Sequence, residues 1–400
     1  MGALTTTEAS AVERAAAEPM LEQVLAWSAI NSGSRNLDGL ARVAGQLADA
    51  FAGLGGDVAL VDADRVEAID SAGKPFEIAH GQHLRVRVRP EARLQLLFTG
   101  HMDTVFPADH PFQETRWLDD GVLGGPGVAD MKGGIAVMLA ALKAVEAAGA
   151  DVGYEVLINS DEEVGSLASA ALIAEAARGK RAALTYEPAA LPDGTLAGAR
   201  PGSGNFAYTV RGRSAHAGRN PEDGRNALLA AADLALRLET MRRPGLSVNP
   251  ARIEGGSPTN VVPDLAVLRV NLRPATPEIE ADAKAELARL TALVAQERDV
   301  AIHAHGGFAR PPKPMTAPME QLFGLVRTAG ADLGQAIGWK PTGGVCDGNN
   351  IAACGVPVVD TMGVRGGKIH SDEEYLIVES LAERAALSAL TVLRLAGEAA

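Results

Sequence analysis

Two kinds of hydrophobic pattern alternate along the first 190 residues. Short apolar runs typical of buried strands stand at 57–62, 94–99, 154–159 and 182–186, and an alternating polar and apolar run stands at 83–89. Between them, apolar residues recur at helical spacing over 10–30 (with a break near Pro19), 36–54, 133–149 and 167–178. Apolar strands that alternate with helices predict an α/β fold, with a mixed sheet flanked by helices.

The pattern changes near residue 200, after a stretch rich in glycine and proline. The expected order becomes strand, helix, strand, strand, helix, strand, over 205–211, 226–242, 252–254, 265–272, 278–298 and 300–304. This order is that of a ferredoxin-like α+β unit. Beyond the proline-rich segment 310–314 the α/β pattern returns, with helices near 319–333 and from about 380 and a strand at 356–360. The sequence therefore predicts an α/β domain of residues 1–200 and 312–400, interrupted by an inserted domain of residues 201–311.

Composition agrees with two domains, because a chain of 400 residues is too long for one ordinary core. The formal charge of −13 argues against nucleic-acid binding, and two cysteines make no disulfide framework. Residues 1–8 lack the basic and apolar regions of a signal peptide, and no apolar run approaches the roughly 20 residues that cross a bilayer. We expect a cytoplasmic protein that binds neither nucleic acid nor membranes.

Side chains that bind metals follow one predicted strand after another or lie in glycine-rich loops. They are His101, Asp103, Asp130, Glu162, Glu163, Glu187 and His370. Each alone could be a structural, capping or surface residue. Together they indicate one site, because open α/β sheets gather ligand groups at the carboxyl ends of their strands. Imidazole nitrogens and carboxylate oxygens suit zinc, and two zinc ions about 3.5–4 Å apart share a bridging ligand.

The adjacent glutamates Glu162 and Glu163 are informative as a pair. One of them can bind a metal while its neighbour faces a metal-activated water and takes its proton. The alternative is an exposed loop or the first turn of a helix, which also attracts negative charge.

Six sequence motifs now resemble a known family. They are Gly-His-Met-Asp-Thr (100–104), Gly-Pro-Gly-Val-Ala-Asp-Met-Lys-Gly-Gly (125–134), Asp-Glu-Glu-Val-Gly-Ser (161–166), Tyr-Glu-Pro (186–188), Gly-Arg-Ser-Ala-His-Ala-Gly (212–218) and Ile-His-Ser-Asp-Glu-Glu-Tyr (369–375). The chain resembles the di-zinc hydrolases that include aminoacylase, acetylornithine deacetylase, succinyl-diaminopimelate desuccinylase and carboxypeptidase G. Residues 343–349 resemble the glutamate carboxypeptidase branch, although a small hydroxyl residue often replaces Cys346 there, so the role of Cys346 stays open.

The resemblance implies two zinc ions per subunit, with cobalt or manganese as substitutes. His101 and Glu187 would bind one or other zinc, Asp130 would bridge the two, and Glu163 and His370 would complete the coordination. The resemblance also implies that Glu162 is the general acid/base and that Asp103 orients His101, as metal-bound imidazoles usually require.

The same resemblance makes the insert a dimerisation domain. His216 would reach the active site of the partner subunit and stabilise the oxyanion. Asn260 and Arg273 would lie near the substrate, and Arg310 would bind a substrate carboxylate, which suits the planar guanidinium.

These expectations describe a homodimeric zinc hydrolase that cleaves the amide bond of an N-acyl amino acid or a short peptide with a free C-terminal carboxylate. One alternative is a deacylase of the acetylornithine or succinyl-diaminopimelate type, which should recognise an amine with acidic pocket residues. A more remote alternative is a non-catalytic protein that binds amino acids or peptides. It is disfavoured because none of the implied metal ligands is replaced, and neither is Glu162.

Overall fold

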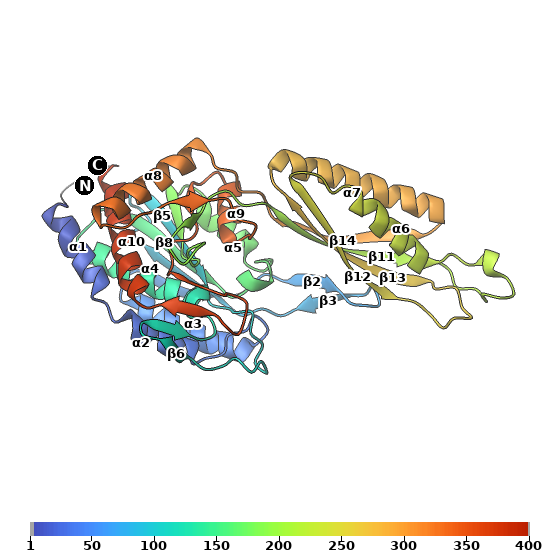
Figure 1. The fold of residues 1–400 in the computed structure, drawn as a ribbon, viewed down its shortest axis with the longest axis horizontal. Helices are drawn as coiled ribbons and strands as arrows, with labels where there is room; N and C mark the ends of the chain where they lie inside the picture. Colours follow the sequence, from blue (N-terminus) through green and yellow to red (C-terminus); the bar gives the residue numbers. More distant parts are fainter. Residues whose placement is uncertain (1–3, 399–400) are drawn as a thin grey trace.

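The computed structural model describes residues 4–398, so the first three residues of the N-terminal segment considered above lie outside it. The chain forms a larger and a smaller lobe, which Figure 1 shows side by side. The first and last described helices, α1 (Thr6–Ala16) and α10 (Glu379–Gly397), pack together at the outer end of the larger lobe. Among residues 4–398, no helix is long and apolar enough to cross a membrane.

The larger lobe is built on a six-stranded mixed sheet. Its strands β5, β8, β9 and β16 are parallel, whereas β4 runs antiparallel to β8 and β1 antiparallel to β4. In order across the sheet they are β1 (Asp57–Val61), β4 (His83–Val88), β8 (Gly153–Asn159), β5 (Gln95–His101), β9 (Ala182–Thr185) and β16 (Val358–Val359). The predicted α/β fold with a mixed sheet is thereby confirmed.

Helices cover both faces of this sheet because side chains alternate along each buried strand. Leu96 and Phe98 pack into a core shared with α1, α2 (Met20–Ser28), α3 (Leu37–Ala52), α4 (Gly133–Ala147), α8 (Ala317–Asp332) and α10. Leu97 and Leu157 face the other way, toward α5 (Ala170–Ala177) and α9 (Asp347–Ala353). The helical segment at 10–30 ends and restarts around Pro19, as its sequence predicts.

The smaller lobe has the ferredoxin-like order that its sequence indicates. An antiparallel sheet runs in the order β12 (Leu246–Gly255), β13 (Leu265–Pro274), β11 (Ser203–Arg211) and β14 (Ala301–Arg310). The helices α6 (Ala227–Glu239) and α7 (Pro277–Arg298) lie on one face of it (Figure 1). Strand β12 is longer than the segment 252–254 expected for it.

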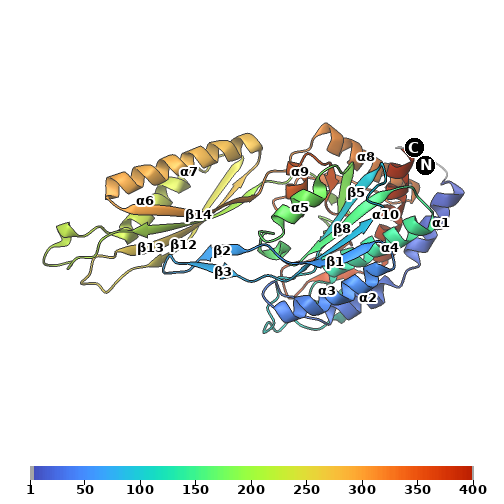
Figure 2. The same cartoon turned by 180° about the vertical axis from the view of Figure 1, so that it is seen from behind.

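A hairpin that the sequence patterns did not predict forms a further connection between the lobes. Its strands β2 (Val66–Ile69) and β3 (Pro75–Ile78) extend from the larger lobe along the smaller one in both views (Figures 1 and 2). Arg269 donates to the carbonyl oxygen of Ile69 at 2.8 Å, and His305 Nε2 lies 2.9 Å from that of Glu67. The two chain crossings lie beside each other, where Arg200 and Lys313 exchange backbone hydrogen bonds.

Two smaller sheets complete the larger lobe. One contains β17 (Gly366–Gly367), β18 (Tyr375–Ile377), β7 (Val122–Gly124) and β6 (Arg116–Asp119), and the other pairs β10 (Leu196–Ala197) with β15 (Trp339–Lys340). Because β18 pairs with β7, the segment with His370 is held against the loop that leads to Asp130.

Candidate active site

The first group of candidate metal ligands centres on His101, the last residue of β5. Its side chain is only 1% exposed. His101 Nε2 lies 3.1 Å from Asp130 Oδ1 and 3.8 Å from Glu187 Oε2. Glu187 follows β9, the strand next to β5, so parallel pairing places both side chains at the same edge of the sheet.

The second group centres on His370, which lies in the loop between β17 and β18. His370 Nε2 is 3.2 Å from Asp130 Oδ2 and 3.1 Å from Glu163 Oε2. His370 adopts a φ of +64°, which is uncommon for a residue other than glycine and is found at functional sites. Asp130 thus directs one carboxylate oxygen toward each histidine, and the two groups share it.

Asp103 supports both parts of this arrangement. Its carboxylate accepts hydrogen bonds from the backbone N–H groups of Glu162 (3.1 Å) and Glu163 (3.2 Å) and from the Ser34 hydroxyl (2.7 Å). His101 Nδ1 lies 3.0 Å from the Asp103 carbonyl oxygen and 3.4 Å from Oδ1. With Nδ1–H donated to that carbonyl, Nε2 is free to bind a metal. Asp103 therefore holds the glutamate turn as well as the histidine.

The electrostatics of the site favour bound cations. Burial raises the pKa of Glu162 well above its usual range and that of Glu187 more modestly, and burial together with Asp130 raises the pKa of Glu163 to about 7. Nearly buried carboxylates that crowd together are costly unless positive charge compensates them. Two imidazoles and three carboxylates with a shared Asp130 are also the donor types that zinc accepts. The residues therefore fit a pair of divalent metal ions.

Glu374 holds the Asp130 loop, and the sequence analysis missed it. Its buried carboxylate accepts backbone N–H bonds from Gly127 at 3.0 Å, Ala129 at 2.9 Å and Asp130 at 3.0 Å. Glu374 belongs to the motif at 369–375, but the pattern does not distinguish it from its neighbour Glu373, which is exposed.

Arg310 contacts the turn that contains Glu162 and Glu163. Its guanidinium contacts Glu162 Oε1 and Asp347 Oδ1, each at 2.7 Å. The expectation was that this arginine would bind a substrate carboxylate, but the side chain is 3% exposed and faces carboxylates of its own chain.

The predicted oxyanion residue His216 and the predicted substrate-site residues Asn260 and Arg273 belong to neither metal-ligand group. His216 and Asn260 are neighbours, since His216 bridges to Val261 and the Ala217 N–H donates to the Asn260 carbonyl. Both are exposed, and the segment between β11 and α6 that contains His216 lies at the end of the smaller lobe farthest from the larger lobe (Figure 1). Arg273 lies nearer the larger lobe and donates to the Gly343 carbonyl at 2.9 Å.

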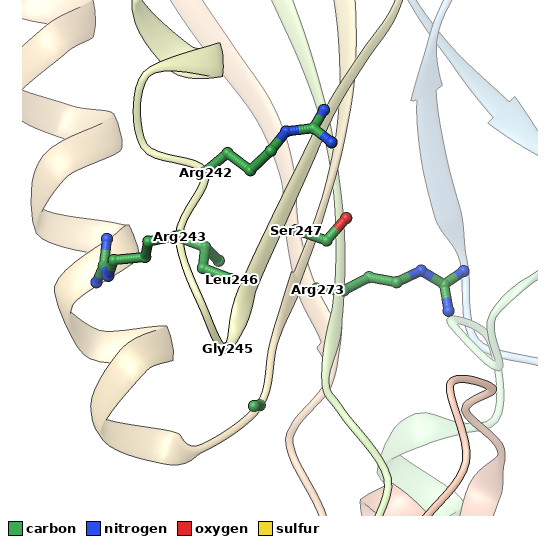
Figure 3. A pocket seen from close by; sticks show the side chains of 7 residues that line it. Arg242, Arg243, Gly245, Leu246, Ser247 and Arg273 are labelled. Atoms are coloured by element: carbon green, nitrogen blue, oxygen red, sulfur yellow. The ribbon is translucent and has the colours of Figure 1, made fainter.

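A shallow pocket on the smaller lobe contains three arginines but does not form an anion site. Figure 3 shows the side chains of Arg242, Arg243 and Arg273 pointing in three different directions. Arg242 and Arg243 also pair with acidic residues, Glu239 and Asp282.

Cys346 is a buried residue at the start of α9. Burial raises the pKa of its thiol well above the usual value, so the thiol is neutral at physiological pH and is no activated nucleophile.

A model of the peptidase family M20/M25/M40 matches residues 97–394, most of the chain. The chain belongs to this family. It is 31% identical to carboxypeptidase G2 of Pseudomonas sp. (strain RS-16) over 329 residues, which cover 79% of this chain and 77% of that protein. It is 34% identical to the succinyl-diaminopimelate desuccinylase of Maricaulis maris over 200 residues, 44% of this chain and 50% of that one.

Solved structures agree on the fold. The aminopeptidase PepT of Bacillus cereus superposes with a TM-score of 0.72 at 23% identity, over 96% of this chain and 99% of that one. YXEP of Bacillus subtilis, a dinuclear metal-binding peptidase, gives 0.65 at 15% identity, over 94% and 98%. The predicted family is confirmed, and the M20 chain is a hydrolase of peptides or acyl amino acids from a metal-dependent family.

Proposed function

We propose that this M20 chain is a di-zinc hydrolase that cleaves the amide bond of an N-acyl amino acid or a short peptide with a free C-terminal carboxylate. The observation that carries the proposal is the shared carboxylate, since Asp130 gives Oδ1 to the His101 group and Oδ2 to the His370 group. His101 and Glu187 would hold one ion, Glu163 and His370 the other, and cobalt or manganese could substitute for zinc.

Zinc bound by these residues would polarise the scissile carbonyl and lower the pKa of a water molecule toward about 7. We propose Glu162 as the general base. It neighbours Glu163 in the chain, its side chain is 10% exposed, and it belongs to neither of the two metal-ligand groups. Its carboxylate would take the proton from the attacking water and deliver it to the nitrogen of the departing amine.

We also propose that a second copy of the chain completes the site. The segment with His216, and Asn260 paired with it, lie at the end of the smaller lobe farthest from the larger lobe (Figure 1), so we infer that they would serve the partner. The outer face of α6 supports self-association, because Leu229 and Leu236 are seven residues apart on the same side of that helix and are 56% and 72% exposed. At the open edge of the adjacent sheet, Ile253 of β12 is 38% exposed. His216 from the partner would donate a hydrogen bond to the oxyanion of the tetrahedral intermediate.

Carboxypeptidase G2 supports the carboxypeptidase assignment, because by name it removes C-terminal residues and it shares 31% identity with this chain. The desuccinylases among the relatives support the alternative of a deacylase that recognises an amine. The retained Glu162 and metal-ligand types argue against a protein that only binds its ligand.

The test is product release from a substrate panel by zinc-loaded protein, with chelated protein as the control. The panel sets benzoyl- and peptidyl-glutamate against acetylornithine and succinyl-diaminopimelate. Chelator-sensitive release of glutamate supports the proposal, whereas turnover of the amine-bearing substrates alone replaces it with the deacylase. If no substrate is cleaved although two metals are bound, the proposed activity is wrong.

A further inference from the structure

Arg310 is the last residue of β14, where the smaller lobe rejoins the larger one. It pairs with Ser203, the first residue of β11, so it stands at the point where both chain crossings meet. A charged side chain that is 3% exposed at such a junction needs partners for its N–H donors.

Those partners are all groups of this chain. Arg310 Nη2 donates to Glu162 Oε1 at 2.7 Å, to the Glu162 carbonyl at 3.1 Å and to the Ser166 hydroxyl at 2.9 Å. Nη1 donates to Asp347 Oδ1 at 2.7 Å and to Asn350 Oδ1 at 3.0 Å. Both terminal nitrogens are thus engaged, and a substrate carboxylate would have to displace one of two charged partners.

The far side of the guanidinium is fixed as well. Asp347 accepts hydrogen bonds from Asn159 Nδ2 at 2.8 Å and from the Ser166 hydroxyl at 2.5 Å. A buried chain of hydrogen bonds therefore runs from Asn159, at the end of β8, through Asp347 and Arg310 to Glu162. None of these four side chains belongs to the two metal-ligand groups.

We propose that Arg310 is a positioning residue for Glu162 and does not bind the substrate carboxylate. This inference rests on the proposed role of Glu162 as general acid/base. One Glu162 oxygen is held by the guanidinium, so the other is presented in a fixed direction for proton transfer, which is sensitive to small displacements. Because the same arginine ends β14, the orientation of Glu162 is also tied to the position of the smaller lobe.

The test compares Arg310→Ala and Arg310→Lys with the native enzyme on two substrates, an N-acyl glutamate and its α-carboxamide. A displacement of about 1 Å in the reacting geometry can lower the rate by about a hundredfold. We expect that loss in kcat for both substrates, with partial recovery in Arg310→Lys. KM and the preference for the carboxylate over the amide should not change. If KM rises for the carboxylate alone and the preference disappears, Arg310 binds the substrate and the inference is wrong.

Further variants separate positioning from a general structural defect. In a Glu162→Gln background, Arg310→Ala should cause no additional loss, whereas an additive loss would contradict an effect through Glu162. Asp347→Asn should lower kcat in the same way at unchanged KM, and bound zinc should stay at the native level in all of these proteins. Arg243→Ala, which removes an exposed arginine of the same lobe, should leave kcat unchanged.

If the native enzyme cleaves none of the panel, the proposed function is wrong, but the role of Arg310 can still be tested by structure. Crystal structures of the native protein and of Arg310→Ala should then show the Glu162 carboxylate fixed in the first and rotated or disordered in the second. An unchanged Glu162 in the variant would overturn the positioning role whatever the activity.

Discussion

Glu374 offers a sharp test of how the Asp130 carboxylate is held in place. The substitution Glu374→Gln keeps the size of the side chain but replaces one carboxylate oxygen with an amide NH₂ group. In the native protein Oε1 accepts from Ala129 and Asp130, and Oε2 accepts from Gly127. The glutamine oxygen can keep the first two bonds, but its NH₂ group then faces the Gly127 N–H, donor against donor.

The magnitude follows from this geometry. One buried N–H loses its acceptor, which costs about 1–3 kcal/mol of folding free energy. Glu374→Ala leaves all three N–H groups without that acceptor and should cost at least about 3 kcal/mol. Because the loop carries Asp130, zinc affinity should also fall, by about ten- to hundredfold in Glu374→Gln.

The assays are urea unfolding of the metal-free protein and competition for zinc with a chelator. Glu373→Gln is the matched control, since Glu373 is the exposed neighbour and pairs only with Lys368 among the ion pairs of the described chain. That control should stay within about 0.5 kcal/mol of the native protein. If Glu374→Gln behaves like the control in both assays, the loop is not held by this carboxylate.

Three further changes have defined outcomes. Gly134→Ala would drive a Cβ into the carbonyl oxygen of Tyr186, next to a metal ligand, and should cost about 3 kcal/mol or more in urea unfolding. Burial raises the pKa of Glu8, but its hydrogen bonds, Arg394 among them, outweigh that and leave it below the usual value. Glu8→Gln should therefore lower the free energy of unfolding by about 1 kcal/mol above about pH 5. This difference from the native protein should become smaller as the pH falls through the lowered pKa of Glu8. Leu236→Glu should convert a dimer into folded monomers in sedimentation velocity.

Each of these changes has a control. Gly324→Ala lies in the interior of α8 with open space around the added methyl group and should not destabilise the protein. Glu13→Gln, on the same helix as Glu8 but exposed, should stay within about 0.5 kcal/mol of the native protein at neutral pH. Trp117→Glu removes an apolar residue that is 56% exposed on the larger lobe and should leave the dimer intact. A control that behaves like its test variant would contradict the corresponding explanation.

The strands that end at the metal ligands could be predicted because buried strands are visible in the sequence as short apolar runs. β5, β8 and β9 are buried on both faces and mostly apolar, and the candidate ligands appear where each strand reaches the edge of the sheet. The hairpin of β2 and β3 could not be predicted in this way, because its four-residue strands bury only Val66 and are stabilised by contacts with the smaller lobe.

The active site also has some features that the sequence could predict and others that it could not. The sequence could name the types of ligand, but the sharing of Asp130 between His101 and His370 depends on how distant segments meet. Glu374 was missed because two adjacent glutamates look alike until one of them is seen buried against three N–H groups. The ion pair of Arg310 with Asp347 could not be predicted from the sequence either, because Asp347 belongs to a helix later in the chain.

The most direct test of the account is the number of zinc ions bound per chain. Metal-free protein would be titrated with zinc and counted by elemental analysis, alongside His101→Ala and His370→Ala. The shared Asp130 predicts two ions in the native chain and a lower count in each variant, with the remaining ligand group still able to bind. A single ion in the native protein, or two retained in both variants, would contradict the two-metal site.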